Sequence, residues 1–132
     1  MKESLIDIGA NLTDASFSQD IESVINRAQK NNISHIIVTG TSVHETRLAL
    51  DLVSQYPNYL SATAGIHPHA VDATSASWFE DLTLLARDSK VVALGEMGLD
   101  YYRNYTSRYK QQEVFDKQLE LAKEIELPVF IH

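Results

Sequence analysis

The sequence contains no cysteine, which excludes disulfide bonds, thiolate nucleophiles and zinc–thiolate sites. It also has no apolar run close to the roughly 20 residues that a membrane-spanning helix needs. Residues 1–5 carry charge but no long apolar stretch follows, so the N-terminus is not a signal peptide. Together these absences predict a cytoplasmic protein that does not associate with a membrane.

Basic side chains are fewer than acidic ones. The chain has 11 Lys and Arg against 18 Asp and Glu, a formal net charge of −7 with histidine neutral. Binding nucleic acid by broad electrostatic attraction requires a basic face, which this composition argues against. A nuclease is still compatible with the charge, because a metal ion and a few arginines supply positive charge locally.

The apolar residues repeat one pattern: a short apolar run, a loop and an amphipathic helix. The runs lie at residues 5–8, 36–38, 60–66, 91–95 and 129–131, and helical spacing follows at 21–28, 42–56, 77–86 and 107–126. In the last helix the predicted buried stripe is Phe115, Leu119, Ala122 and Ile125. Strict alternation predicts a parallel α/β sheet with functional loops after the carboxyl ends of the strands.

The length leaves two architectures open. A chain of 132 residues can form one ordinary domain, whereas a complete (β/α)₈ barrel usually needs roughly 250 residues. The chain is therefore either a smaller α/β unit, such as a doubly wound open sheet, or the first part of a longer barrel. The local pattern is the same for both, so the choice depends on the site residues.

Two strand ends carry side chains that bind metals. Glu96 ends the fourth apolar run and His132 ends the fifth. A histidine and a carboxylate at the carboxyl ends of parallel strands are typical of a divalent-metal site in a β/α barrel. We therefore predict Glu96 and His132 as metal ligands. Taken alone, Glu96 also suits a salt-bridged loop carboxylate, and His132 a terminal histidine without a role.

Two further histidines, His67 and His69, follow the third predicted strand. Pro68 lies between them and stiffens the backbone. They are candidates for contacting a substrate phosphate, and His67 is also a candidate catalytic residue in proton transfer. The alternative is a rigid turn with one buried histidine.

The stretch from residue 100 to 105 interleaves tyrosines with one arginine. Aromatic rings stack on unpaired bases, and a guanidinium group grips a phosphate. Tyr102 and Arg103 are therefore predicted to bind substrate. The alternative for the tyrosines is packing of this loop against the rim of the fold.

Five segments, one per predicted strand, together resemble the TatD family of metal-dependent deoxyribonucleases, within the amidohydrolase-type barrels. They are residues 7–12 (DIGANL), 39–41 (TGT), 65–69 (GIHPH), 95–100 (GEMGLD) and 128–132 (PVFIH). The resemblance implies a TIM-type (β/α)₈ barrel, of which residues 1–132 form the N-terminal portion of a single domain with about the first five strands. It also implies a Mg²⁺- or Mn²⁺-dependent nuclease that hydrolyses phosphodiester bonds of DNA, or of RNA, from a 3′ end.

The resemblance assigns roles to single residues. Glu96 and His132 match metal ligands of the family, and His67 and Arg103 match positions near the scissile phosphate. We expect one or two ions, with oxygen-rich ligands favouring Mg²⁺ or Mn²⁺ over Zn²⁺. The expected partners are single-stranded DNA ends or RNA, and the full-length protein is expected to be monomeric.

The chain departs from the family pattern in the first strand. Many members carry two ligand histidines there, where this chain has Gly9 and Asn11. Glycine has no side chain to bind a metal, so the ion depends on later ligands. A further histidine and an aspartate are expected from strands that follow residue 132.

Two other functions compete with the nuclease. The first is a small-molecule amidohydrolase or deaminase, whose members usually carry the paired first-strand histidines and often a carboxylated lysine where this chain has Glu96. The second is a non-catalytic truncated fragment, because an open barrel exposes sheet edges and lacks part of its ligand set.

Overall fold

The computed structural model describes residues 3–132, in which five strands and four α-helices alternate along the chain. The strands are β1 (Leu5–Ala10), β2 (Ile33–Val38), β3 (Leu60–Ala64), β4 (Val91–Met97) and β5 (Val129–Ile131). The helices are α1 (Ile21–Lys30), α2 (Val43–Gln55), α3 (Trp78–Ala86) and α4 (Arg108–Ile125), with short 3₁₀ turns η1 (Ala15–Phe17) and η2 (Pro68–Ala73). Every strand and helix expected from the sequence is present.

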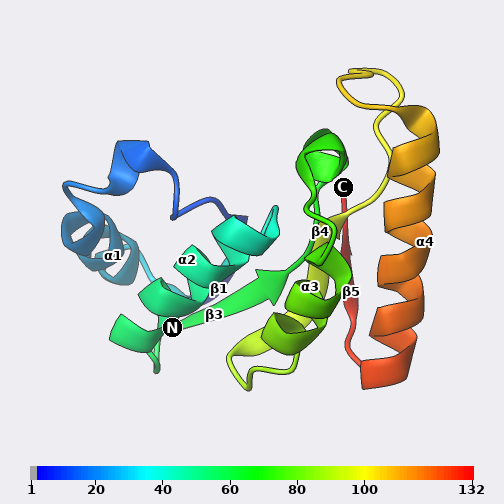
Figure 1. The fold of residues 1–132 in the computed structure, drawn as a ribbon. Coiled ribbons are helices and arrows are strands. Elements are labelled where there is room, and N and C mark those ends of the chain that lie inside the picture. The colour runs from blue at the N-terminus through cyan, green and yellow to red at the C-terminus, as the bar shows by residue number, and fades with distance from the viewer. Residues whose placement is uncertain (1–2) are drawn as a thin grey trace.

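The sheet is built in sequence order. Its strand order is β1-β2-β3-β4-β5, and each neighbouring pair is parallel. The helices follow one another around the outside of this sheet (Figure 1). A doubly wound sheet would reverse its strand order at a switch point, whereas a barrel adds each strand beside the last. The described residues therefore form half of a β/α barrel, as predicted.

The two faces of the sheet differ in what covers them. Ile36 and Val38 are buried in the core that the sheet forms with its helices. The residues of the opposite, inner face surround a cavity of about 150 Å³, to which every strand contributes a side chain: Ile8, Ile37, Thr63, Ala93 and Phe130. Because β1 and β5 line the same cavity, the sheet curves strongly enough to bring its first and last strands towards each other.

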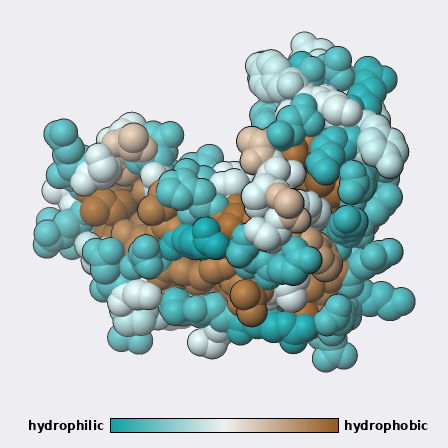
Figure 2. All heavy atoms as spheres, in the orientation of Figure 1, coloured by the Kyte–Doolittle hydropathy of each residue, from teal (hydrophilic) through white to brown (hydrophobic). Residues whose placement is uncertain are grey.

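Apolar side chains are exposed on both edge strands. Leu5, Ile6 and Ile8 of β1 and Val129 and Ile131 of β5 are among the exposed large hydrophobic residues. Figure 2 shows apolar surface in the middle of the face drawn, whereas the lobe at the upper right is mainly hydrophilic. An unpaired apolar strand edge is a surface to which another strand can add. None of the helices in residues 3–132 combines the length and the apolar character needed to cross a bilayer.

The buried face of helix α4 coincides only in part with the predicted stripe, since Ala122 is buried and Ile125 packs against the core. Leu119 was expected in the buried stripe but is 38% exposed. The fully buried positions instead include Gln111, Val114, Gln118 and Leu121. The prediction was wrong at Leu119 because two buried residues of this face are polar, so a pattern of apolar residues does not reveal them.

These two glutamines hold the loops that follow β3 and β4. The Gln118 amide accepts the N–H of Ile66 at 2.8 Å and donates to the Ile66 carbonyl at 3.1 Å. The Gln111 side chain accepts the N–H of Asp100 at 2.8 Å and donates to the Thr106 hydroxyl at 3.0 Å. Because Ile66 bonds to helix α4 instead of a neighbouring strand, β3 ends at Ala64 and not at residue 66 as predicted.

We predict that Gln118→Leu destabilises the fold by about 2 kcal/mol or more, because it leaves the buried N–H and C=O of Ile66 without partners. Urea denaturation followed by circular dichroism measures the change. The matched control is Gln112→Leu on the exposed side of the same helix, where the amide bonds only to Asp116. Equal midpoints for the two variants would show that the Gln118 bonds contribute little.

Candidate metal centre

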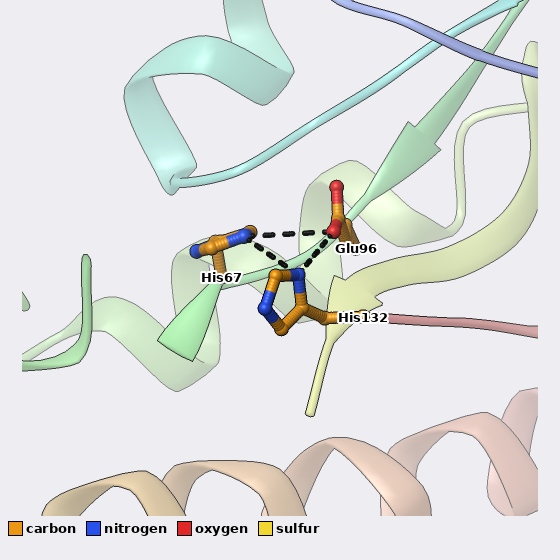
Figure 3. A group of neighbouring side chains, drawn as sticks. All are labelled: His67, Glu96 and His132. Atoms are coloured by element: carbon orange, nitrogen blue, oxygen red, sulfur yellow. Dashed lines mark hydrogen bonds and ion pairs between the residues drawn. The ribbon is translucent and has the colours of Figure 1, made fainter. Parts of the chain in front are cut away.

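Three side chains from the carboxyl ends of β3, β4 and β5 converge on one point (Figure 3). His132 Nδ1 lies 2.8 Å from Glu96 Oε1 and 3.2 Å from His67 Nε2. His67 Nε2 lies 3.5 Å from Glu96 Oε1. The structure thus brings together both predicted metal ligands and the predicted catalytic histidine.

Pairing of β4 with β5 places the side chains of Glu96 and His132. In the β4–β5 ladder Met97 lies opposite Ile131, and Glu96 falls at an irregularity in the register. Such irregularities redirect a side chain near active sites. The N–H of His132 continues the ladder by donating to the Met97 carbonyl at 2.8 Å, and the N–H of Glu96 donates to Gly40 at 2.9 Å. The two ligands therefore depend on one register.

His67 is held by the backbone around it. Its N–H donates to the Thr41 carbonyl at 2.9 Å. Its ring Nδ1 accepts the backbone N–H of His69 at 3.0 Å, which caps the turn η2. A ring nitrogen that accepts a hydrogen bond carries no proton, so the neutral imidazole has its proton on Nε2. That Nε2–H points at the space between Glu96 and His132.

A second group shares His132 with the first. Asp100 Oδ2 lies 2.7 Å from His69 Nε2 and 3.0 Å from His132 Nε2. Asp100 Oδ1 accepts the backbone N–H of Arg103 at 2.9 Å. The structure therefore places His69 against Asp100, beside the Glu96 cluster. Asp100 was not predicted as a site residue, although it ends the family-like segment 95–100 and begins the 100–105 stretch.

The surroundings shift the pKa values of three of these groups. Burial lowers the pKa of His67, only partly opposed by Glu96. Burial also acts to lower the pKa of His132, but hydrogen bonds with Glu96 and Asp100 outweigh it and raise that pKa. The backbone N–H of Arg103, helped by His69 and His132, holds the pKa of Asp100 well below its usual range. The surroundings thus favour the neutral form of His67 and the protonated form of His132.

The donor atoms fit a divalent cation. A ring nitrogen and a carboxylate oxygen that each bind an ion at about 2.0–2.2 Å as adjacent octahedral ligands lie roughly 3 Å apart. The separation between His132 Nδ1 and Glu96 Oε1, 2.8 Å, agrees with this. A cation there would bind the Nδ1 lone pair of His132, which requires that nitrogen to carry no proton.

A side chain at position 9 of the first strand would be strained and would meet the Phe130 ring. Gly9 has φ of +100°, and a Cβ built there would lie 2.7 Å from Cζ of Phe130. The Phe130 ring thus occupies the space that a side chain of residue 9 would need. Asn11 is exposed in the loop after β1. The glycine that replaces the family's histidine at position 9 therefore packs against Phe130 of β5.

The loop after β4 presents aromatic and basic groups beside Asp100. Tyr102 is 93% exposed, and Arg103 is exposed next to it. Tyr101 instead packs beneath the Arg108 guanidinium, 4.9 Å from its ring centroid. The ring of Tyr105 lies edge-on to His69 with centroids 4.8 Å apart. Tyr101 thus packs against Arg108, whereas Tyr102 and Tyr105 are largely exposed beside the site.

Comparison with known proteins agrees with the family resemblance found in the sequence. Residues 6–132 match the family described as TatD related DNase. A Pantoea sp. (strain At-9b) protein named 3'-5' ssDNA/RNA exonuclease TatD is 43% identical over 128 residues, which are 97% of this chain and 49% of that protein. The Erwinia amylovora protein of the same name is 44% identical over the same shares. The chain thus spans about half the length of these relatives.

Solved structures agree with the fold. YJJV, a TatD homologue from Escherichia coli K12, has a TM-score of 0.88 and 35% identity, covering 97% of this chain and 50% of its own. A TatD family hydrolase from Entamoeba histolytica has a TM-score of 0.89 and 32% identity, covering 100% and 50%. With a family match along nearly the whole sequence and a ligand cluster at its strand ends, this chain belongs to the TatD-related DNase family.

Proposed function

We propose that the intact protein is a divalent-metal-dependent nuclease that hydrolyses phosphodiester bonds of single-stranded DNA, and of RNA, from the 3′ end. The observation that carries the proposal is the convergence of Glu96, His132 and His67 at three neighbouring strand ends. The curated relatives named 3'-5' ssDNA/RNA exonuclease support the substrate and the direction. In this proposal residues 1–132 are the N-terminal portion of one barrel domain.

Glu96 and His132 would hold Mg²⁺ or Mn²⁺, with Zn²⁺ less favoured because the remaining expected ligands are rich in oxygen. A bound ion would lower the pKa of a water molecule and shield charge on the phosphate. Of one or two ions, we favour one, since Gly9 and the Phe130 ring leave no room for a ligand at that position of the first strand.

His67 would act as a hydrogen-bond donor to the phosphate. Its neutral ring carries the proton on Nε2, and that atom faces the Glu96 carboxylate from 3.5 Å. A fixed N–H aimed at developing negative charge stabilises a phosphoryl transition state. This geometry favours a catalytic and phosphate-binding role for His67 over a role as a third metal ligand.

Three other residues would bind the nucleic acid strand. The exposed Tyr102 ring suits stacking on an unpaired base, and the Arg103 guanidinium suits a phosphate. His69 bonds to Asp100 through Nε2, which leaves its other ring nitrogen for substrate. Since the chain is acidic overall, these local groups must replace a broad basic surface.

The amidohydrolase alternative is not favoured, because the chain belongs to the TatD-related DNase family and the first-strand position is a closed glycine. The monomeric state and the cytoplasmic location stay predictions.

Incubating the intact protein with single-stranded DNA and with cyclic amides distinguishes the nuclease from the amidohydrolase. Turnover of the amide alone would overturn the nuclease proposal.

We predict that Glu96→Gln lowers nuclease activity by about 100-fold or more without unfolding the protein, because the metal loses a charged ligand. Shortening of 5′-labelled single-stranded DNA in Mn²⁺ measures the change, and circular dichroism checks the fold. In the wild type, EDTA should abolish activity and Mg²⁺ or Mn²⁺ should restore it.

The matched control for this variant is Glu124→Gln, which removes a carboxylate paired with Arg87 on the surface and should keep full activity. If Glu96→Gln turned over DNA at the wild-type rate, Glu96 would have no part in the mechanism.

We predict that Tyr102→Ala and Arg103→Ala each raise KM for single-stranded DNA by about 10-fold, with a smaller effect on kcat. The reason is that stacking on one base contributes roughly 1–3 kcal/mol and that a phosphate contact is of similar strength. Steady-state kinetics on oligonucleotides measures both constants. Arg27→Ala on α1, which removes an exposed arginine near Asp20, is the control. An unchanged KM in both variants would place the substrate elsewhere.

A further inference from the structure

Asp100 connects two histidines through a single oxygen atom. Its Oδ2 lies 2.7 Å from His69 Nε2 and 3.0 Å from His132 Nε2. The Asp100 side chain is only 9% exposed, whereas those of His69 and His132 are each 31% exposed. The carboxylate thus lies behind the two rings, on the side away from solvent.

The carboxylate is itself fixed in place. Asp100 Oδ1 accepts the backbone N–H of Arg103 at 2.9 Å. The backbone N–H of Asp100 donates to the Gln111 side chain at 2.8 Å, and Gln111 is fully buried on α4. Both the backbone and the side chain of Asp100 are therefore held by partners that are independent of the two histidines.

These bonds determine which ring nitrogens carry protons. An ionised carboxylate only accepts hydrogen bonds, so His69 and His132 each present N–H at Nε2 to Asp100. The lone pair of His132 is then available at Nδ1, which lies 2.8 Å from Glu96 Oε1 in the proposed metal centre. Histidine ligands in metal sites usually have their second nitrogen bonded to a carboxylate in this way.

We propose that Asp100 is the positioning residue of the centre, which sets the ring orientation and the tautomer of His132 and His69 together. This inference rests on the proposed function, since it assigns His132 to the metal and His69 to the substrate. One carboxylate thereby orients a ligand on β5 and a substrate-facing histidine in the loop after β3. Loss of Asp100 disturbs both, although Asp100 touches neither the ion nor the substrate.

The same three residues permit another arrangement. Ligand atoms of His69, Asp100 and His132 lie within 4.8 Å of one another, so they form a candidate site for a second cation. Hydrogen bonding is favoured because Asp100 Oδ1 is already bonded to the N–H of Arg103 and Oδ2 is the one atom that both ring nitrogens face. The number of bound ions distinguishes the two arrangements.

The test compares Asp100→Asn with the wild-type intact protein. Mn²⁺ titration followed by electron paramagnetic resonance should show one ion per wild-type chain and an affinity about 10–100-fold weaker in the variant. The control is Asp88→Asn, whose carboxylate bonds to Lys90 in a loop far from the strand carboxyl ends and whose loss should leave Mn²⁺ affinity unchanged. Thermal unfolding checks that both variants are folded.

A second measurement needs no variant. Nitrogen-15 NMR of the Mg²⁺-loaded wild type should find the protons of His132 and His69 on Nε2. Protons on Nδ1 in either ring would overturn the proposal, as would an Asp100→Asn affinity within twofold of the wild type. Two Mn²⁺ ions per wild-type chain, with one lost in Asp100→Asn, would make Asp100 a ligand and would also overturn it.

The outcome is separate from that of the proposed function. If the wild-type protein binds Mn²⁺ but does not cut single-stranded nucleic acid, the nuclease proposal is overturned. The Mn²⁺ affinity of Asp100→Asn and the histidine tautomers still decide the role of Asp100.

Discussion

The placement of His132 between Glu96 and Asp100 is the interaction on which the site depends. The His132 ring uses both nitrogens, at 2.8 Å from Glu96 and 3.0 Å from Asp100, so its position links the Glu96 group to the Asp100 group. That ring is placed by the β4–β5 ladder, which ends with the His132 N–H on the Met97 carbonyl. A slip of one residue in this register would turn His132 to the other face of the sheet and dismantle both groups.

Helix α4 contributes to the same centre from outside the barrel. Gln118 fixes the backbone just before His67, and Gln111 fixes the backbone of Asp100. Both glutamines are fully buried, which is costly unless every polar atom is bonded. Their amides satisfy loop backbone groups that have no strand partner, so α4 supports the loops as well as packing on the sheet. The precision of the centre therefore depends on a helix that supplies no ligand.

The inner face of the half-barrel explains the unusual first strand. A side chain at Gly9 would be strained because φ is +100°, and the Phe130 ring lies where its Cβ would be. The candidate ligands among the described residues lie at the carboxyl ends of β3, β4 and β5, beside the loop that carries the exposed tyrosine and arginine. An acidic protein that acts on nucleic acid requires such concentration, since its surface as a whole repels phosphate. The chain spans about half the length of its curated relatives, and its two edge strands expose apolar side chains.

The sequence by itself determined the order of strands and helices and the presence of Glu96 and His132 at strand ends, because these are local patterns of apolar runs and their boundaries. Only the tertiary structure decided that His67 faces Glu96 with its Nε2–H, that Asp100 joins His69 to His132, and that Phe130 fills the space beside Gly9. It also decided which face of α4 is buried, where Leu119 misled the prediction. The reason is physical: these features are contacts between segments tens of residues apart, and periodicity along a chain carries no information about which distant atoms meet.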